Sequence, residues 1–280
     1  MVRTDLALES SENFNGEGIR KTERGEVFRI TEIVIDDDKS GEGIGKKKGR
    51  YITLEGRSFG MFSTDFRDMC VEFARELSGL IPNGNVLVAG LGNSDITPDA
   101  LGPLTASKIL ATRHLKKELD MEAEFFSNMR PVGVIAGGVM GQTGIETAEL
   151  ISAVMKKVEP VCIVAVDALA CSDVNRLGRT IQISDTGISP GSGVQNKRQE
   201  LSHDTLGVPV IAIGIPTVVD MHTIVSNYTG SRLSDKLPNM MVTPRDVDRL
   251  ITRSASVLAA GINMALQPNL DFDEIEDLMW

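Results

Sequence analysis

The stretch VLVAGLGNSDITPDALGP, residues 86–103, decides the fold. An apolar run ends at a Gly-x-Gly turn, and a polar loop then carries Asp95 and Asp99 up to a helix that we expect over residues 99–115. A buried strand that turns on glycines into a helix is typical of a strand–helix–strand unit. Such a loop can bind a phosphate, hold a metal or present a carboxylate for chemistry.

The same alternation of strand and helix continues along the chain. Apolar runs at 131–138, 160–170 and 208–220 predict strands, and periodic segments predict helices over 144–157 and from Thr243 onward. Strands that are apolar throughout are buried on both faces. We therefore expect an α/β fold with a mostly parallel sheet and helices on both faces.

The first third of the chain contains further elements. Residues 26–36 and 50–56 predict strands, the insert DDDKSGEGIGKKKGR between them predicts a charged, solvated loop, and 64–79 predict an amphipathic helix. Residues 1–24 are polar and predict a loosely tied N-terminal arm. The rest, 25–280, shows no internal repeat, and we expect it to form a single α/β domain.

Composition limits the classes of partner. A formal charge of −10 argues against direct nucleic-acid binding, which needs a basic face. No apolar run approaches the roughly 20 residues that span a bilayer, so no membrane association is expected. Three widely spaced cysteines do not suggest a disulfide framework, and the expected location is the reducing cytoplasm.

Common cofactor and nucleophile motifs are absent or broken. After Gly90 and Gly92, the third glycine of the dinucleotide fingerprint is replaced by Asp95, whose carboxylate would repel a pyrophosphate. In GISPG, the backbone N–H that an oxyanion hole needs after Ser189 is missing, because the next residue is proline. The three histidines lack metal-ligand spacing, and His222 remains only a weak metal candidate. We expect no cofactor.

Three predicted strands end in aspartates: Asp99, Asp167 and Asp220. Ligands of open α/β sheets bind at the carboxyl ends of the strands, so these residues could share one site. Two carboxylates held close together have pKa values that move apart, so that one acts as a general base on water and the other as an acid. The alternative, that Asp99 caps a helix and Asp167 merely ends a strand, stays open at this point.

Five ordered motifs carry a family resemblance. GLGNSDITPDALGP (90–103), GGVMGQTGIET (137–147), VAVDALA (164–170), TGISPGSGVQNKR (186–198) and IGIPTVVD (213–220) resemble those of the spore germination protease. This family is an atypical aspartic endopeptidase that degrades small acid-soluble spore proteins during germination. The resemblance extends from about Val2 to Pro268, and it implies a phosphorylase/hydrolase-like fold similar to that of the hydrogenase maturation proteases.

The resemblance also implies roles for particular residues. It places the two catalytic aspartates at Asp99 and Asp167, and it implies that VRTDLALE (2–9) is a self-processing site cut between Asp5 and Leu6, which would make residues 1–5 a pro-segment of a zymogen. It further implies a homotetramer in the forespore or spore core. The candidates for supporting the pair or lining the substrate path are Gly92, Asn93, Gly138, Gly187, Gly191 and Asp220.

Two other functions remain open from the sequence. One is a metal-dependent endopeptidase like the hydrogenase maturation enzymes, in which Asp99, Asp167 and His222 would meet a metal in the partner protein. The other is a spore-protein binding module that has lost catalysis. Indifference of cleavage to chelators would count against the first, and any cleavage at all would count against the second.

Overall fold

A computed structural model describes residues 4–12, 17–62, 64–115, 128–191, 198–231, 233 and 237–279. Within these residues, nine strands form one sheet, in the order β1-β2-β3-β7-β8-β6-β4-β5, with β9 paired to β8. The strands are β1 (Ile19–Arg24), β2 (Arg29–Ile35), β3 (Gly49–Glu55), β4 (Val86–Gly90), β5 (Val132–Ile135), β6 (Cys162–Ala170), β7 (Thr180–Ser184), β8 (Val210–Asp220) and β9 (Met241–Val242).

The sheet has a parallel and an antiparallel half that meet at β8. The strands β8, β6, β4 and β5 run parallel to one another. The strands β1, β2, β3, β7 and β8 pair antiparallel. The α/β class predicted from the sequence is confirmed, with the difference that the predicted parallel strands make up only one half of the sheet.

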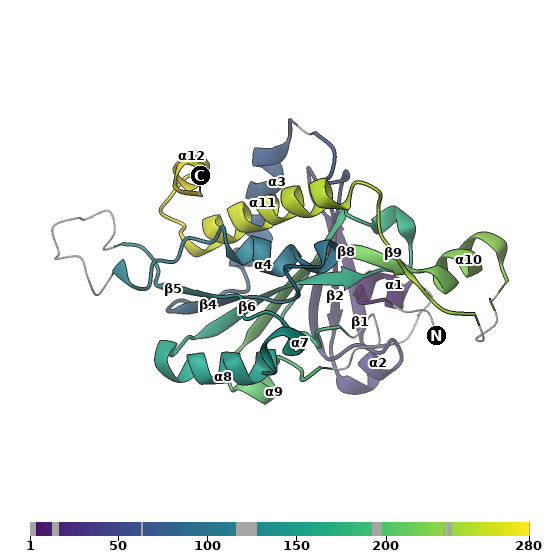
Figure 1. Cartoon of the computed structure of the whole chain (residues 1–280), viewed down its shortest axis with the longest axis horizontal. Helices are drawn as coiled ribbons and strands as arrows, with labels where there is room; N and C mark the ends of the chain where they lie inside the picture. Colours follow the sequence, from purple (N-terminus) through teal and green to yellow (C-terminus); the bar gives the residue numbers. More distant parts are fainter. Residues whose placement is uncertain are drawn as a thin grey trace.

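Helices cover both faces of the sheet (Figure 1). On one face lie α3, α4 and α11, and on the other lie α7, α8 and α9. In the described residues, no helix is long and apolar enough to cross a membrane. The helices are α1 (Ala7–Ser11), α2 (Asp38–Glu42), α3 (Phe66–Ser78), α4 (Leu101–Ala106), α7 (Met140–Thr143), α8 (Thr147–Val158), α9 (His203–Leu206), α10 (Met221–Thr229), α11 (Val247–Leu266) and α12 (Phe272–Met279), with single 3-10 turns at Thr97–Asp99 and Val174–Arg176.

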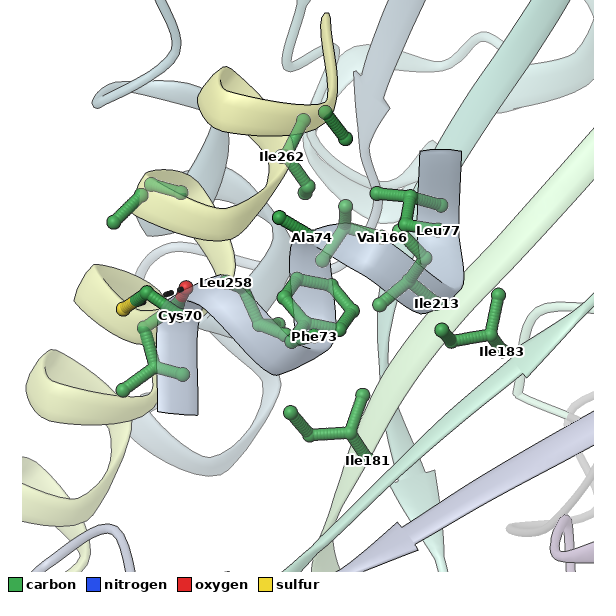
Figure 2. Close-up of a cluster of buried hydrophobic side chains, with 14 of the residues drawn as sticks. Cys70, Phe73, Ala74, Leu77, Val166, Ile181, Ile183, Ile213, Leu258 and Ile262 are labelled. Atoms are coloured by element: carbon green, nitrogen blue, oxygen red, sulfur yellow. Dashed lines mark hydrogen bonds between the residues drawn. The ribbon is translucent and has the colours of Figure 1, made fainter. Parts of the chain in front are cut away.

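The main core lies between the sheet and the helices α3 and α11. Figure 2 shows Phe73 of α3 enclosed by isoleucines of β7 and β8 and by Leu258 and Ile262 of α11. The two helices approach closely because α11 has Gly261 at the contact, where an added Cβ would come within 2.2 Å of the Phe73 ring. Most of the apolar positions that predicted the two helices are buried, and Phe66 and Val247 at the helix starts are partly buried.

The helix predicted over 99–115 is much shorter in the structure, because Asn263 of α11 ends it. The Asn263 side-chain amide donates to the carbonyl oxygen of Lys108 at 3.0 Å, and its oxygen accepts from the backbone N–H of Leu110 at 2.9 Å. These contacts replace the bonds that the next helical turn would have made. The chain then turns toward β5, where the Arg113 N–H donates to the carbonyl of Val132.

The N-terminal segment is packed against the sheet, which corrects the prediction of a loosely tied arm. Residues 19–24 form the edge strand β1, which pairs with β2 over its whole length. Leu6 and Ala7 are fully buried. Leu6 lies in an apolar cluster with Leu169, Cys171 and Val219. The polar residues 19–24, which suggested a loose arm, form the edge strand β1, and their side chains are mostly exposed to solvent.

Candidate active site

Asp99 is held at the end of β4 by the loop quoted above. It closes a 3-10 turn whose Pro98 carbonyl accepts a hydrogen bond from the buried Thr217 hydroxyl of β8, at 2.8 Å. The turn lies so close to Gly92 that an added Cβ there would come within 2.1 Å of the Asp99 carbonyl oxygen. Gly92 also has a φ of +113°, which other residues rarely adopt. The loop glycine therefore makes room for the chain's own aspartate rather than for a phosphate.

Asp167 lies on the neighbouring strand β6 and is almost fully buried. Its strand partner is Gly214 of β8, and its Oδ1 accepts from the backbone N–H of Ala168 at 2.9 Å. Because β4 and β6 are adjacent and parallel, with Gly90 opposite Val166, their carboxyl ends meet at the same edge. Asp99 and Asp167 consequently line one cavity of about 430 Å³.

The site disfavours two negative charges. Burial raises the pKa of Asp167 well above its ordinary value, and the nearby carboxylates of Asp99 and Asp5 raise it further. Burial also raises the pKa of Asp99, but the Asn93 N–H that donates to its Oδ2 at 2.8 Å and the charge of Arg198 oppose this rise. The environment therefore favours an ionised Asp99 beside a protonated Asp167.

A second layer braces the Asn93 turn. The Gln142 side chain of α7 donates to Asn93 Oδ1 at 2.7 Å and to Asp95 Oδ2 at 2.8 Å. Gly138, with a φ of +69°, precedes α7 at a point where an added Cβ would press on the Gln142 side-chain oxygen. Gly138 thus acts from outside the cavity, through Gln142.

The predicted processing bond lies at the site. Asp5 lines the same cavity as Asp99 and Asp167, and it also lines an adjoining cavity of about 280 Å³ with Gly187 and Gly191. Its backbone N–H donates to the Ala170 carbonyl at 2.9 Å, and its Oδ2 accepts from the Ala170 N–H at 2.8 Å. The segment around Asp5 is therefore docked along the end of β6, three residues beyond Asp167.

Asp5 is held by two side chains that the sequence did not single out. Its carbonyl oxygen accepts hydrogen bonds from Lys46 Nζ at 2.8 Å and from Gln182 Nε2 at 3.0 Å. Lys46 belongs to the insert that we predicted to be a solvated loop. Gln182 lies inside β7, in a strand that was not predicted. Arg198, whose charge acts on both aspartates, was likewise not identified from its motif.

Asp220 does not join the pair, although the sequence placed it at a strand end. It caps α10, where its carboxylate accepts from the backbone N–H and the hydroxyl of Thr223, at 2.8 Å and 2.6 Å. β8 continues for six residues past Gly214, the partner of Asp167, which amounts to about 20 Å at roughly 3.3 Å per residue. Strands of different length therefore place their last residues at different distances along the strand direction.

His222 follows Asp220 on α10 and does not line either cavity that Asp5 lines. Among the residues that the structure describes, no group of three or more His, Cys, Asp or Glu side chains could hold a metal ion. The trio of Asp99, Asp167 and His222 that the metal-dependent alternative requires is therefore not assembled.

Comparisons with known proteins agree with one another. The sequence profile of the family described as "Germination protease" matches residues 2–234. The germination protease of Clostridium acetobutylicum is 40% identical over 98% of this chain and 98% of its own. That of Priestia megaterium is 38% identical over 96% and 95%.

A solved structure also resembles the chain at low similarity. The [NiFe] hydrogenase maturation protease HycI from Thermococcus kodakarensis aligns with 67% of this chain and 98% of its own, at 18% identity and a TM-score of 0.37. Nothing about the site follows from a likeness at that level.

Proposed function

This chain belongs to the germination protease family, and we propose that Asp99 and Asp167 are the catalytic pair of an aspartic-type endopeptidase. The observation that carries the proposal is that both carboxylates line one cavity, which Asp5 also lines. A protease needs a group that activates water and a group that protonates the leaving amine, next to a peptide bond.

The environments of the two aspartates suggest their roles. Asp99 keeps an N–H donor and the nearby charge of Arg198, both of which favour its ionised form, so it is the base that takes a proton from water. Asp167 is buried beside other carboxylates, so it is the acid. Activity then requires Asp99 ionised and Asp167 protonated. It falls at low pH as Asp99 gains a proton and at high pH as Asp167 loses one.

The proposal includes self-processing between Asp5 and Leu6. It is supported by the position of Asp5 at the cavity of the pair, with Leu6 buried next to it. Residues 1–5 would then be the pro-segment of a zymogen. In that form residues 4–9 occupy the place along β6 where another protein's peptide has to bind.

Substrate and setting rest on the family resemblance. The substrates are small acid-soluble spore proteins, cut in the cytoplasm of the forespore or germinating spore by a homotetramer. Gly187 and Gly191 line the cavity beside Asp5, where an extended peptide would approach. The proposal involves no cofactor, nucleic acid or membrane.

Mass spectrometry tests the proposal directly. The full chain is incubated with a small acid-soluble spore protein, in parallel with the Asp99→Asn variant and with the exposed control Asp204→Asn. We expect the wild type and the control to cut the substrate and the Asp5–Leu6 bond, and Asp99→Asn to cut neither. Cutting by Asp99→Asn at the wild-type rate would remove Asp99 from the mechanism, and no cutting by the wild type would reject the protease proposal.

A further inference from the structure

Two donors converge on one carbonyl oxygen, that of Asp5. Lys46 Nζ approaches it to 2.8 Å from the segment between α2 and β3, and Gln182 Nε2 approaches it to 3.0 Å from the middle of β7. A carbonyl oxygen that accepts two hydrogen bonds from side chains of separate elements has the arrangement of an oxyanion hole. In this case the carbonyl belongs to the bond that the chain is proposed to cut.

The Gln182 amide has a fixed orientation. Its oxygen accepts the backbone N–H of Ala7 at 2.6 Å, which leaves its NH₂ group to donate to Asp5 on the other side of the bond. The side chain is only 8% exposed, and the strand partners of β7 on both sides hold its backbone in place. A donor held in this way needs no reorganisation when charge develops on the oxygen.

The surroundings of Lys46 act on the pKa of its amine in two opposite directions. Burial lowers the pKa of its amine, while the carboxylates of Asp5 and Glu9 act in the opposite direction. Its described hydrogen bonds go to peptide oxygens, at 2.8 Å to Asp5 and 3.5 Å to Thr4. A partly buried amine that donates to this carbonyl oxygen is suited to a negative charge that appears on it during the reaction.

The donors and Asp99 line different cavities beside Asp5. The cavity of about 280 Å³ is lined by Lys46 and Gln182 but not by Asp99. The cavity of about 430 Å³ is lined by Asp99 but not by Lys46 or Gln182. Asp5 and Asp167 line both. The donors to the Asp5 carbonyl oxygen thus line one cavity, Asp99 lines the other, and Asp167 lies where the two meet.

We propose that Lys46 and Gln182 form the oxyanion-binding site of this protease and stabilise the tetrahedral intermediate in the cleavage of the Asp5–Leu6 bond. Asp99 takes a proton from water as its oxygen adds to the Asp5 carbonyl carbon, and the carbonyl electron pair moves onto the oxygen between Lys46 and Gln182. The pair then returns, the C–N bond breaks, and the Leu6 nitrogen takes the proton of Asp167. The inference rests on the proposed function, since it presupposes that this bond is cut.

The test uses the full chain and measures the rate at which the product beginning at Leu6 appears in the mass spectrum. We expect Lys46→Met and Gln182→Glu each to slow this cut by about 100-fold, the effect of removing one oxyanion donor. The control Lys48→Met changes an exposed lysine of the same segment and should cut at the wild-type rate. Gln182→Glu keeps an acceptor for the Ala7 N–H and, when ionised, loses the donor and gains a negative charge.

Two readouts separate a catalytic role from mere docking of the segment. A protonated glutamic acid can donate, so the deficit of Gln182→Glu should shrink as the pH falls, while in an Asp99→Asn background the Leu6–Ser10 amides stay protected from hydrogen exchange at every pH, which loss of docking would not produce. In an Asp99→Asn background, Lys46→Met should leave hydrogen exchange of the Leu6–Ser10 amides protected. A slower cut that merely follows lost protection would overturn the proposal for Lys46.

The two levels of the hypothesis fail separately. If the wild type cuts the Asp5–Leu6 bond and both variants cut it at the wild-type rate, the oxyanion assignment is wrong and the proposed function stands. If the wild type does not cut this bond, the proposed self-processing fails and the assignment fails with it. Should Lys46→Met fail to fold by circular dichroism, the pH-dependent deficit of Gln182→Glu decides the matter together with the amide protection of that variant in an Asp99→Asn background.

Discussion

The two halves of the sheet contribute to the site in different ways. The parallel half presents Asp99 and Asp167 just where β4 ends and near the end of β6, as α/β sheets commonly present functional groups. The antiparallel half contributes Gln182 from the middle of β7 and Lys46 from the segment before β3. In the proposed mechanism the parallel half performs the proton transfers, and the antiparallel half stabilises the oxyanion. Substitutions in the two halves should fail in different ways.

The largest effect is expected from Asp167→Asn in the parallel half. General acid–base groups contribute about 100-fold to 10,000-fold, so we expect self-cleavage to fall by about 1,000-fold, more than for Gln182→Glu in the antiparallel half. The rate is measured by mass spectrometry, with Asp204→Asn as the control. Equal losses in the two halves would contradict the division of roles.

The same variant should change the pH dependence of stability. The folded state holds the Asp167 proton more tightly than the unfolded state, so this stabilisation is complete below the ordinary carboxyl range and is lost as the pH rises through the raised pKa. Asparagine cannot ionise. Unfolding free energies are measured with urea. The value for Asp167→Asn minus that for the wild type should therefore increase as the pH rises and then level off. Curves that stay parallel would show that Asp167 ionises normally.

Gly92→Ala should reduce both stability and activity. The new Cβ would be within 2.1 Å of the Asp99 carbonyl oxygen at a φ of +113°, so we expect a loss of about 2–4 kcal/mol in urea unfolding. Displacement of Asp99 should also slow cleavage by about 10-fold to 100-fold. Gly141→Ala is the matched control, because an added Cβ there meets nothing within 4 Å. A variant as stable and active as the control would mean that the loop moves freely.

Thr217→Val should have a smaller effect. It removes the hydroxyl that donates to the Pro98 carbonyl, which ties β8 to the turn of Asp99. A buried hydrogen bond of this kind contributes about 1 kcal/mol, and urea unfolding should show a loss of that size. Thr252→Val removes a hydroxyl on the exposed face of α11 and should have little effect. If both variants lose the same free energy of unfolding, the hydrogen bond between Thr217 and Pro98 makes no specific contribution to stability.

The smallest change is expected from Arg198→Gln. The charge of Arg198 lowers the pKa of both aspartates, so its removal should move both limbs of the pH–rate profile to higher pH. Arg75→Gln on the exposed face of α3 should leave the profile unchanged. A shift of one limb alone would show that Arg198 acts on only one member of the pair.

The sequence predicted the parallel half better than the antiparallel half. β4, β6 and β8 are continuous apolar runs that end in glycines and aspartates, a local pattern that shows both the strand and its functional end. β1 is polar and solvent-facing, and the short TIQIS of β7 has no flanking signal. Their places depend on pairing with distant strands, which no local pattern records.

Within the site, the sequence could not show how far each strand extends or which side chains contact one another. Asp99 and Asp167 were predicted together because both follow strands, and the structure places them at one cavity. Asp220 satisfied the same rule but lies further along β8, because strand length beyond the sheet edge is set by packing. Lys46 was hidden in a charged insert of a kind that is usually solvated. The role proposed for it depends on a contact with Asp5, 41 residues earlier in the chain.

The complete burial of Leu6 bears on the reversibility of the proposed self-processing. Before the cut, the Leu6 side chain packs among Leu169, Cys171 and Val219, and its neutral peptide N–H donates to the Thr4 hydroxyl at 3.0 Å. Hydrolysis would turn this nitrogen into an ammonium and would leave a new carboxylate on Asp5, and an ammonium attached to a buried residue is costly to keep out of water. The proposed cut would therefore favour release of the severed ends toward solvent, and with it the opening of the cavity that Asp99 and Asp167 line.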